Sequence, residues 1–386
     1  MAFTRPGAPA PTSSVSNAQA LANRSVQNAN RAGSTAMQAA SPSVPVEITG
    51  ADGQHFTVSF GDVRDFICPK ATDSLNRKKR LGGIACFGDS LTSIGGWEDV
   101  IHAKTMLPVF NFGQGGEASQ GIAARQGGKS IMIDQLTIPA DTSEVVIAMR
   151  QDGLKTNDGK RAALITLPAS NTGNSGINPC SIGGIEGYFE LIAPDGNGNS
   201  ETAYWMFRRN ESGNEVIIDR PTELITNAMI HFNDAMLVIF MGANDGTSEL
   251  EGIVNLHQKM IDFNRNPGRK YICVGRHLGI DTDESGNLYA GPLTEQYERA
   301  MMEAFGRKFV SLRQYITTPV YDGENIVSCY GMQDAGLVCT ASDIDAIRRG
   351  TCPPSLMTDA IHFTKAMRNV VGEYLYKRMK ALGYFD

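Results

Sequence analysis

Apolar runs alternate with amphipathic stretches over much of the chain. Four short runs contain almost no polar positions, which is typical of strands buried on both faces of a parallel sheet. They are Ile84–Phe87, Val109–Phe112, Met236–Met241 and Tyr271–Val274. Stretches with helical character lie between and after them, at 97–105, 117–126, 249–264, 294–306 and 364–381. This alternation predicts an α/β domain with a parallel, doubly wound sheet.

Residues 129–230 break this alternation. They contain short runs rich in β-forming residues, separated by Gly, Asn, Asp and Pro. The expected strands are Ser130–Ile133, Val145–Met149, Ala163–Leu167, Tyr188–Ile192, Ala203–Phe207 and Glu215–Ile218. Many short strands at this spacing predict an all-β domain, a jelly-roll-like sandwich, inserted between two parts of the α/β domain at 83–128 and 231–386.

The N-terminal part has a different composition. Residues 1–45 are rich in Ala, Ser, Asn and Gln, and they contain three Arg and no acidic residue. Two interpretations fit: a disordered tail, or a thin Ala-lined helix that is stable only on a partner or in a bundle. Residues 46–82 form a short connecting region, with strands expected at Val46–Thr49 and His55–Phe60.

Composition excludes several classes of protein. The 386 residues are 41% hydrophobic and 20% charged, as expected of a globular chain. With 35 basic and 41 acidic residues the net charge is −6, so we expect no nucleic-acid partner. No apolar run is long enough to cross a membrane, and the first residues do not predict a secretory signal peptide. Seven scattered cysteines without a CxxC pair predict neither a zinc site nor a disulfide framework, and no cofactor is expected.

Four short motifs carry the candidate chemistry. Gly88–Thr92 (GDSLT) follows the first buried strand, and Asn111–Glu117 (NFGQGGE) follows the second. Gly242–Asp245 (GAND) follows the third, and Asp359–His362 (DAIH) precedes the last helix. Ligands of open α/β sheets gather at the carboxyl ends of the strands, where three of the four motifs lie.

In this order the motifs resemble the four signature blocks of the SGNH (GDSL) hydrolase family of esterases and lipases, over 83–126 and 232–382. The resemblance implies a flavodoxin-like, three-layer α/β/α sandwich. It also implies an oxyanion hole made by the backbone N–H groups of Ser90 and Gly116 and the side-chain amide of Asn244.

The residue types agree with these roles. Ser90 is the candidate nucleophile, and a serine hydroxyl needs a base to take its proton. His362 is the candidate base, because its pKa lies near working pH. Asp359, three residues earlier, can reach the far ring nitrogen. Asp89 is expected to bond the local backbone. Arg125 is a candidate substrate-binding residue at the mouth of the site, with an ordinary place on a helix surface as the alternative.

Two further resemblances bear on function. The runs Gly183–Phe189 and Phe207–Asn214 are similar to inserts in SGNH proteins of phage tails and in carbohydrate-active bacterial esterases. Residues 1–45 resemble the anchoring segments of phage tail fibres and tailspikes. Together they imply a carbohydrate O-acetylesterase acting on a surface polysaccharide, as a homotrimer or attached to a phage tail through residues 1–45. Otherwise the protein is expected in the cytoplasm.

Two other functions remain open at this stage. One is a structural or receptor-binding virion protein that uses the SGNH domain to bind glycan. The other is a lipase or thioesterase for longer acyl chains, which would need an apolar groove beside Ser90. The residues around the motifs are rich in Gly, Asn and Ser, and give no sign of such a groove.

Overall fold

The structure is a computed structural model that describes residues 45–49, 55–59, 83–150, 153–162, 164, 176–194, 201–247, 250–266 and 268–385. The chain divides into two compact units, Met1–Arg80 and Leu81–Asp386. In the first, β1 (Pro45–Thr49) and β2 (His55–Ser59) form an antiparallel hairpin, which confirms the two strands expected there. The tail-or-helix question for residues 1–45 falls outside the described residues, apart from Pro45.

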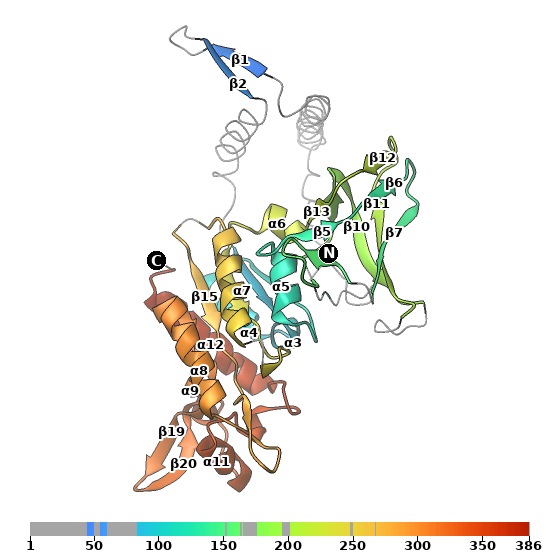
Figure 1. Ribbon diagram of the computed structural model, residues 1–386. Coiled ribbons are helices and arrows are strands. Elements are labelled where there is room, and N and C mark those ends of the chain that lie inside the picture. The colour runs from blue at the N-terminus through green and yellow to red at the C-terminus, as the bar shows by residue number, and fades with distance from the viewer. Residues whose placement is uncertain are drawn as a thin grey trace, which may run out of the picture. The chain divides into compact units, whose positions relative to one another are not determined.

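A five-stranded parallel sheet is the centre of the second unit (Figure 1). Its order is β18-β15-β14-β3-β4, which is 5-4-3-1-2 when these strands are numbered along the chain. Their bounds are β3 Ile84–Gly88, β4 Val109–Gly113, β14 Met236–Phe240, β15 Tyr271–Val274 and β18 Phe309–Val310. The four predicted strands are therefore confirmed. The sequence missed β18, because two residues are too few to show a pattern.

Helices cover both faces of this sheet. Successive residues of β3 point to opposite faces, so Ile84 and Cys86 join one core and Ala85 and Phe87 the other. The first core takes side chains from α4 (Trp97–Thr105), α9 (Leu312–Thr317) and α12 (Lys365–Ala381). The second takes them from α5 (Ser119–Gln126), α7 (Leu250–Phe263) and α8 (Pro292–Phe305). The predicted α/β architecture, a parallel sheet with helices on both faces, is confirmed.

The predicted long helices are confirmed to within a few residues. Helix α12 has its N-cap at Thr364, whose hydroxyl accepts a hydrogen bond from the N–H of Met367 at 3.2 Å. Gly383, just beyond its end, has φ of 70°, a left-handed conformation that glycine adopts without cost. None of the helices in the described part of the chain combines the length and the apolar character needed to span a membrane.

The inserted segment forms a curled antiparallel sheet of seven strands, ordered β7-β11-β10-β9-β13-β5-β8, with a two-stranded companion, β12-β6 (Figure 1). Trp205 and Phe189 stack at 5.2 Å in its core. The bounds are β5 Ile131–Ile133, β6 Leu136–Ile138, β7 Glu144–Met149, β8 Lys155–Thr156, β9 Cys180–Ile182, β10 Ile185–Ile192, β11 Tyr204–Arg209, β12 Val216–Ile218 and β13 Thr222–Ile225.

The expectation of a β insert is thus confirmed, the antiparallel pairing is a finding of the structure, and the jelly-roll-like architecture stays a prediction. Four of its strands, β6, β8, β9 and β13, were not expected from the sequence. They have two to four residues each, too few for an alternating pattern to be recognised. The expected strand Ala163–Leu167 lies largely outside the described residues.

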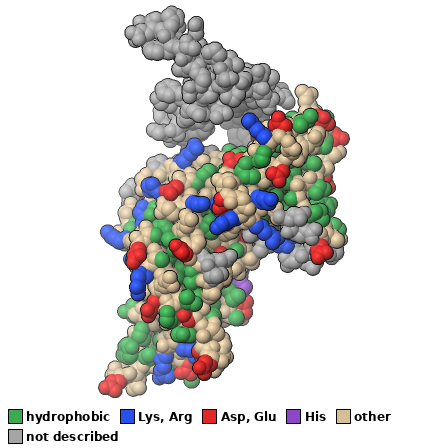
Figure 2. Space-filling view, viewed as in Figure 1, with side chains coloured by type: hydrophobic (Ala, Val, Ile, Leu, Met, Phe, Trp, Pro, Cys, Tyr) green, Lys and Arg blue, Asp and Glu red, His purple; other side chains and the backbone are tan. Residues whose placement is uncertain are grey.

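Small elements complete the second unit. They are α3 Ser90–Ser93, α6 Asn227–His231, β16 Asp281–Thr282, β17 Leu288–Tyr289, η3 Gly306–Lys308, β19 Pro319–Asp322, β20 Asn325–Cys329, α10 Tyr330–Asp334, α11 Ala341–Arg348 and η4 Pro354–Leu356. On the face drawn in Figure 2, acidic and basic side chains are interspersed rather than gathered by sign.

Two helical glycines test the packing of these layers. A Cβ on Gly372 of α12 would lie 2.4 Å from the carbonyl oxygen of Trp97 on α4, whereas a Cβ on Gly252 of α7 would meet nothing within 4 Å. We therefore expect Gly372→Ala to lower the free energy of unfolding by about 1–3 kcal/mol. Gly252→Ala should raise it by about 0.5–1 kcal/mol. Urea unfolding measures both, and equal effects would contradict this account of the α4–α12 contact.

Candidate active site

The first three motifs meet at one edge of the parallel sheet. β3 lies between β4 and β14, and the direction of strand addition reverses between β3 and β14. In open α/β sheets a crevice for ligands forms at such a reversal, outside the carboxyl ends of the strands. Gly88–Thr92 begins with the last residue of β3, Gly113–Glu117 begins with the last residue of β4, and Gly242–Asp245 follows β14. The topology therefore brings together residues separated by more than 150 positions.

Ser90 is held at a sharp turn from strand to helix. It is the first residue of α3, and the N-cap is Asp89, whose Oδ1 accepts a hydrogen bond from the N–H of Leu91 at 3.0 Å. The preceding Gly88 is tightly enclosed, because a Cβ there would lie 2.2 Å from the carbonyl oxygen of Phe240. The turn thus depends on a glycine and a capping carboxylate, and it leaves Ser90 half-buried.

The same carboxylate connects the first motif to the third. Oδ2 of Asp89 accepts a hydrogen bond from the N–H of Ala243 at 3.3 Å. The side chain is completely buried, and this burial raises the pKa of Asp89 to about 6. The expectation that Asp89 bonds the local backbone is confirmed, and its bond to the loop after β14 extends it.

The loop after β4 is fixed against the Ser90 turn. The N–H of Gln114 donates to the carbonyl of Gly88 at 3.0 Å. A Cβ on Gly113 would lie 2.1 Å from the backbone nitrogen of Ser93, so the two loops touch through their backbones. Gly116 is exposed and has φ of 75°, a conformation that favours glycine.

Ser90, His362 and Asp359 form a hydrogen-bonded chain. Nε2 of His362 lies 2.9 Å from Oγ of Ser90, and Nδ1 lies 2.8 Å from Oδ2 of Asp359. Because a carboxylate only accepts, Nδ1 carries the proton in the neutral ring, and Nε2 is left to accept from the serine. Hydrogen bonds from the ring and from two backbone N–H groups lower the pKa of Asp359 to about 2, so it is ionised at neutral pH.

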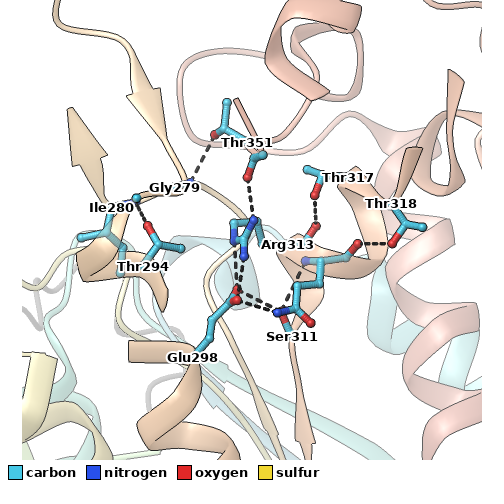
Figure 3. A network of polar contacts seen from close by, with 12 residues as sticks. Gly279, Ile280, Thr294, Glu298, Ser311, Arg313, Thr317, Thr318 and Thr351 are labelled. Atoms are coloured by element: carbon cyan, nitrogen blue, oxygen red, sulfur yellow. Dashed lines mark hydrogen bonds and ion pairs between the residues drawn. The ribbon is translucent and has the colours of Figure 1, made fainter. Parts of the chain in front are cut away.

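A polar network fixes the chain segment that leads to this turn (Figure 3). Arg313 of α9 makes two hydrogen bonds to Glu298 of α8, at 2.6 and 2.9 Å, and a third to the carbonyl of Gly350 at 2.8 Å. The hydroxyl of Thr351 accepts from the N–H of Gly279 at 3.2 Å. These contacts fix the chain at Gly350 and Thr351, about ten residues before His362.

Asn244 lies beside the second motif. Its side-chain amide donates to the carbonyl of Glu117 at 3.1 Å, next to the peptide of Gly116. Asp245 of the third motif adds a contact just beyond the second motif, because its carboxylate accepts from the hydroxyl of Ser119, the first residue of α5, at 2.8 Å. The structure therefore brings the loops carrying Ser90, Gly116 and Asn244 into contact. The fourth motif reaches the same place through the contact between His362 and Ser90.

Arg125 is not where the sequence analysis placed it. Its side chain is 0% exposed, so it neither lines the mouth of the site nor lies on a helix surface. Its Nε donates to the buried carboxylate of Glu117 at 2.7 Å, and Nη1 donates to the carbonyl of Phe112 at 2.9 Å. A buried arginine requires such partners. Nothing in the sequence indicated this burial, and α5 also meets a residue from much later in the chain: the hydroxyl of Thr226 donates to the carbonyl of Arg125 at 2.8 Å.

His277 also belongs to the surroundings of the site, and the sequence analysis did not single it out. It is buried just after β15, and Nε2 contacts the carbonyl of Ile361 at 2.8 Å. No short motif surrounds it, so only the three-dimensional structure identifies it. Within the described residues, no group of three or more His, Cys, Asp or Glu side chains is arranged to hold a metal ion.

Comparisons with known proteins do not assign this chain to a family. No family model matches this chain, and no curated protein matches it. Among solved structures, one match is named "Peptidoglycan O-acetylesterase in action, 5 min". It is 10% identical, covers 81% of this chain and 95% of its own, and has a TM-score of 0.30. Similarity at this level supports no inference about function, which must be argued from the site.

Asp89 predicts a dependence of stability on pH. Its pKa is about 6 in the folded chain against an ordinary value of 3.8, so the folded state binds this proton more tightly than the unfolded state. Stability should therefore fall as pH rises from about 4 to about 6, by on the order of 3 kcal/mol from this group. Asp89→Asn removes the titration and keeps a capping side chain. Urea unfolding of both proteins across this range measures the difference, and parallel pH profiles would contradict the assignment.

Proposed function

We propose that the protein is a serine ester hydrolase of the SGNH type, with a flavodoxin-like sandwich, that removes O-acetyl groups from a polysaccharide. The observation that carries the proposal is the continuous chain from Ser90 through His362 to Asp359, with distances of 2.9 and 2.8 Å. Nucleophile, base and orienting carboxylate are the three groups that acyl transfer by serine needs.

In the proposed mechanism, Oγ of Ser90 attacks the ester carbonyl while Nε2 of His362 takes the hydroxyl proton. The tetrahedral intermediate collapses, the C–O bond to the sugar breaks, and His362 gives its proton to the leaving sugar oxygen. Water then attacks the acetyl-serine with His362 again as base, which releases acetate and restores Ser90. Asp359 stays ionised throughout and stabilises the imidazolium form.

Three donors are proposed to bind the negative oxygen of the intermediate. Ser90 is the first residue of α3, and the first N–H groups of a helix have no partner within it. The second is the peptide N–H of Gly116, an exposed residue, and the third is the side-chain amide of Asn244, which donates to the carbonyl of the next residue, Glu117. Removing one such donor costs about 10²–10³ in rate in other serine hydrolases.

Two features bear on the substrate. The loop after β4 runs beside Ser90, where a Cβ on Gly115 would lie in ordinary van der Waals contact, 3.9 Å from Cβ of Ser90, so this loop borders the proposed place of the acyl group. Beside Asp359, a pocket of about 350 Å³ has a mixed apolar and polar lining, which suits the leaving-group sugar. It is lined by Leu278, Cys352, Pro354, Met357, Thr358, Asp359 and Ala360.

Substitutions in the hydrogen-bonded chain test the mechanism. With p-nitrophenyl acetate, we expect Ser90→Ala to lower kcat/KM by about 10³–10⁶-fold. Asp359→Asn should lower it by about 10³–10⁴-fold, because the amide no longer selects the Nδ1–H form of His362. Ser93→Ala, an exposed serine of the same short helix, is the control and should stay within about twofold of wild type. Full activity of a folded Ser90→Ala protein would exclude the mechanism.

Substrate preference tests the acetyl and carbohydrate parts of the proposal separately. Among p-nitrophenyl esters, kcat/KM should be highest for acetate and fall as the acyl chain lengthens. Ser90-dependent release of acetate from O-acetylated polysaccharides, measured enzymatically, should accompany it. A preference for longer chains would support a lipase or thioesterase instead, and activity on nitrophenyl acetate without release from any acetylated glycan would contradict the polysaccharide substrate.

A further inference from the structure

The turn that carries Asp359 and His362 stands out toward solvent. The side chain of Asp359 is 55% exposed and that of His362 is 27% exposed. Most of the turn's hydrogen bonds are internal: Oδ1 of Asp359 accepts from the N–H groups of Ile361 and His362, each at 2.8 Å, and the N–H of Thr358 donates to the carbonyl of His362 at 2.7 Å. These bonds shape the turn, but they do not fix it relative to Ser90.

His277 supplies a connection from outside the turn. Its Nε2 lies 2.8 Å from the carbonyl oxygen of Ile361, the residue before His362. Its ring meets the ring of Phe363, the residue after His362, edge to face at 4.5 Å. Apart from the Ser90–His362 bond itself, it is the one side-chain hydrogen bond in the described chain that joins residues 358–362 to a distant element. His277 therefore contacts the backbone just before His362 and the side chain just after it.

The protonation state of His277 follows from its partner and its burial. A carbonyl oxygen only accepts, so Nε2 carries the hydrogen. Burial lowers the pKa of His277 to about 3, and the ring is neutral at ordinary pH. The nearby charged groups, Arg276 and His362, lower this pKa further. The contact is therefore present, in one tautomer, throughout the range in which His362 acts as a base.

Packing alone does not account for a histidine at this position. In the neutral ring Nδ1 is an acceptor, and within the described residues this buried atom has no hydrogen-bond partner. A buried polar atom without a partner is unfavourable, and an aliphatic side chain would fill the space without one. What the histidine adds over an apolar residue is the hydrogen bond to Ile361.

We propose that His277 is a positioning residue that fixes the turn of Asp359 and His362 so that Nε2 of His362 stays within reach of Ser90. This inference rests on the proposed esterase function. His277 does not touch substrate, and it acts only through the carbonyl of Ile361 and the ring of Phe363. Small displacements of a catalytic base lower the rate strongly, since a shift of about 1 Å can cost about 10²-fold.

The experiment compares His277→Leu with His277→Gln in the full chain. Leucine removes the donor, whereas the side-chain amide nitrogen of glutamine can occupy the place of Nε2. We expect His277→Leu to lower kcat for p-nitrophenyl acetate by about 10–100-fold, with KM within about threefold of wild type. His277→Gln should recover most of the loss. Equal kcat for wild type and His277→Leu, or no recovery by glutamine, would overturn the proposal.

A matched control separates positioning from general destabilisation. His257 on α7 is also fully buried and also contacts one carbonyl, that of Ile253, at 2.9 Å, but it does not touch the turn. His257→Leu should lower the thermal unfolding temperature about as much as His277→Leu and leave kcat within about twofold. A comparable fall of kcat in both variants would assign the effect to lost stability and overturn the positioning role.

A second readout does not depend on esterase activity. The Nδ1 proton of His362, shared with Asp359, should give a low-field ¹H NMR signal that is protected in wild type, His277→Gln and His257→Leu. In His277→Leu this signal should broaden or exchange faster with water. If the wild-type chain hydrolyses no ester but this pattern holds, the proposed function fails while the positioning by His277 stands. An unchanged signal in His277→Leu overturns the positioning role itself.

Discussion

Asp89 accepts hydrogen bonds from the N–H groups of Leu91 and Ala243, and in this way joins the turn after β3 to the loop after β14. The rest of the site depends on this contact. The turn presents Ser90, and the loop after β14 presents Asn244 toward the backbone of Glu117. Burying a carboxylate that contacts no counter-ion among the described residues is costly, as its raised pKa shows. This unfavourable burial of Asp89 occurs where the strand order of the sheet reverses, beside the candidate site.

The two halves of the site are built in different ways. On the sheet side, the backbones are in close contact at Gly88 and Gly113, where any side chain would collide. A buried ion pair between Arg125 and Glu117 stabilises the second motif. On the other side, Asp359 and His362 lie on an exposed turn that is mostly bonded to itself. A rigid nucleophile thus faces a base whose position is set by few contacts, so these contacts control the alignment of the two.

The sequence predicted the parts of this structure that have a local signal. Short, continuous apolar runs predicted β3 and β14, and the motifs after them predicted Ser90 and Asn244, because ligands of open α/β sheets gather at the carboxyl ends of the strands. It could not predict that Arg125 is buried, because residues far away in the chain meet this helix: Thr226, about a hundred residues later, donates to the carbonyl of Arg125. It did not distinguish His277 either, because nothing next to it in the chain reveals that Ile361, more than eighty residues away, is its partner. Strands of two or three residues, such as β18, carry no pattern at all.

The central claim is that Ser90 forms a covalent bond to the acyl group. The most direct test is intact-mass spectrometry, followed by peptide mapping, of the full chain treated with a p-nitrophenyl phosphonate, which mimics the tetrahedral intermediate and is not readily released. The account predicts one adduct for each chain, located on Ser90, and none on Ser90→Ala. A folded protein that stays unmodified, or an adduct on another residue that persists in Ser90→Ala, would contradict it.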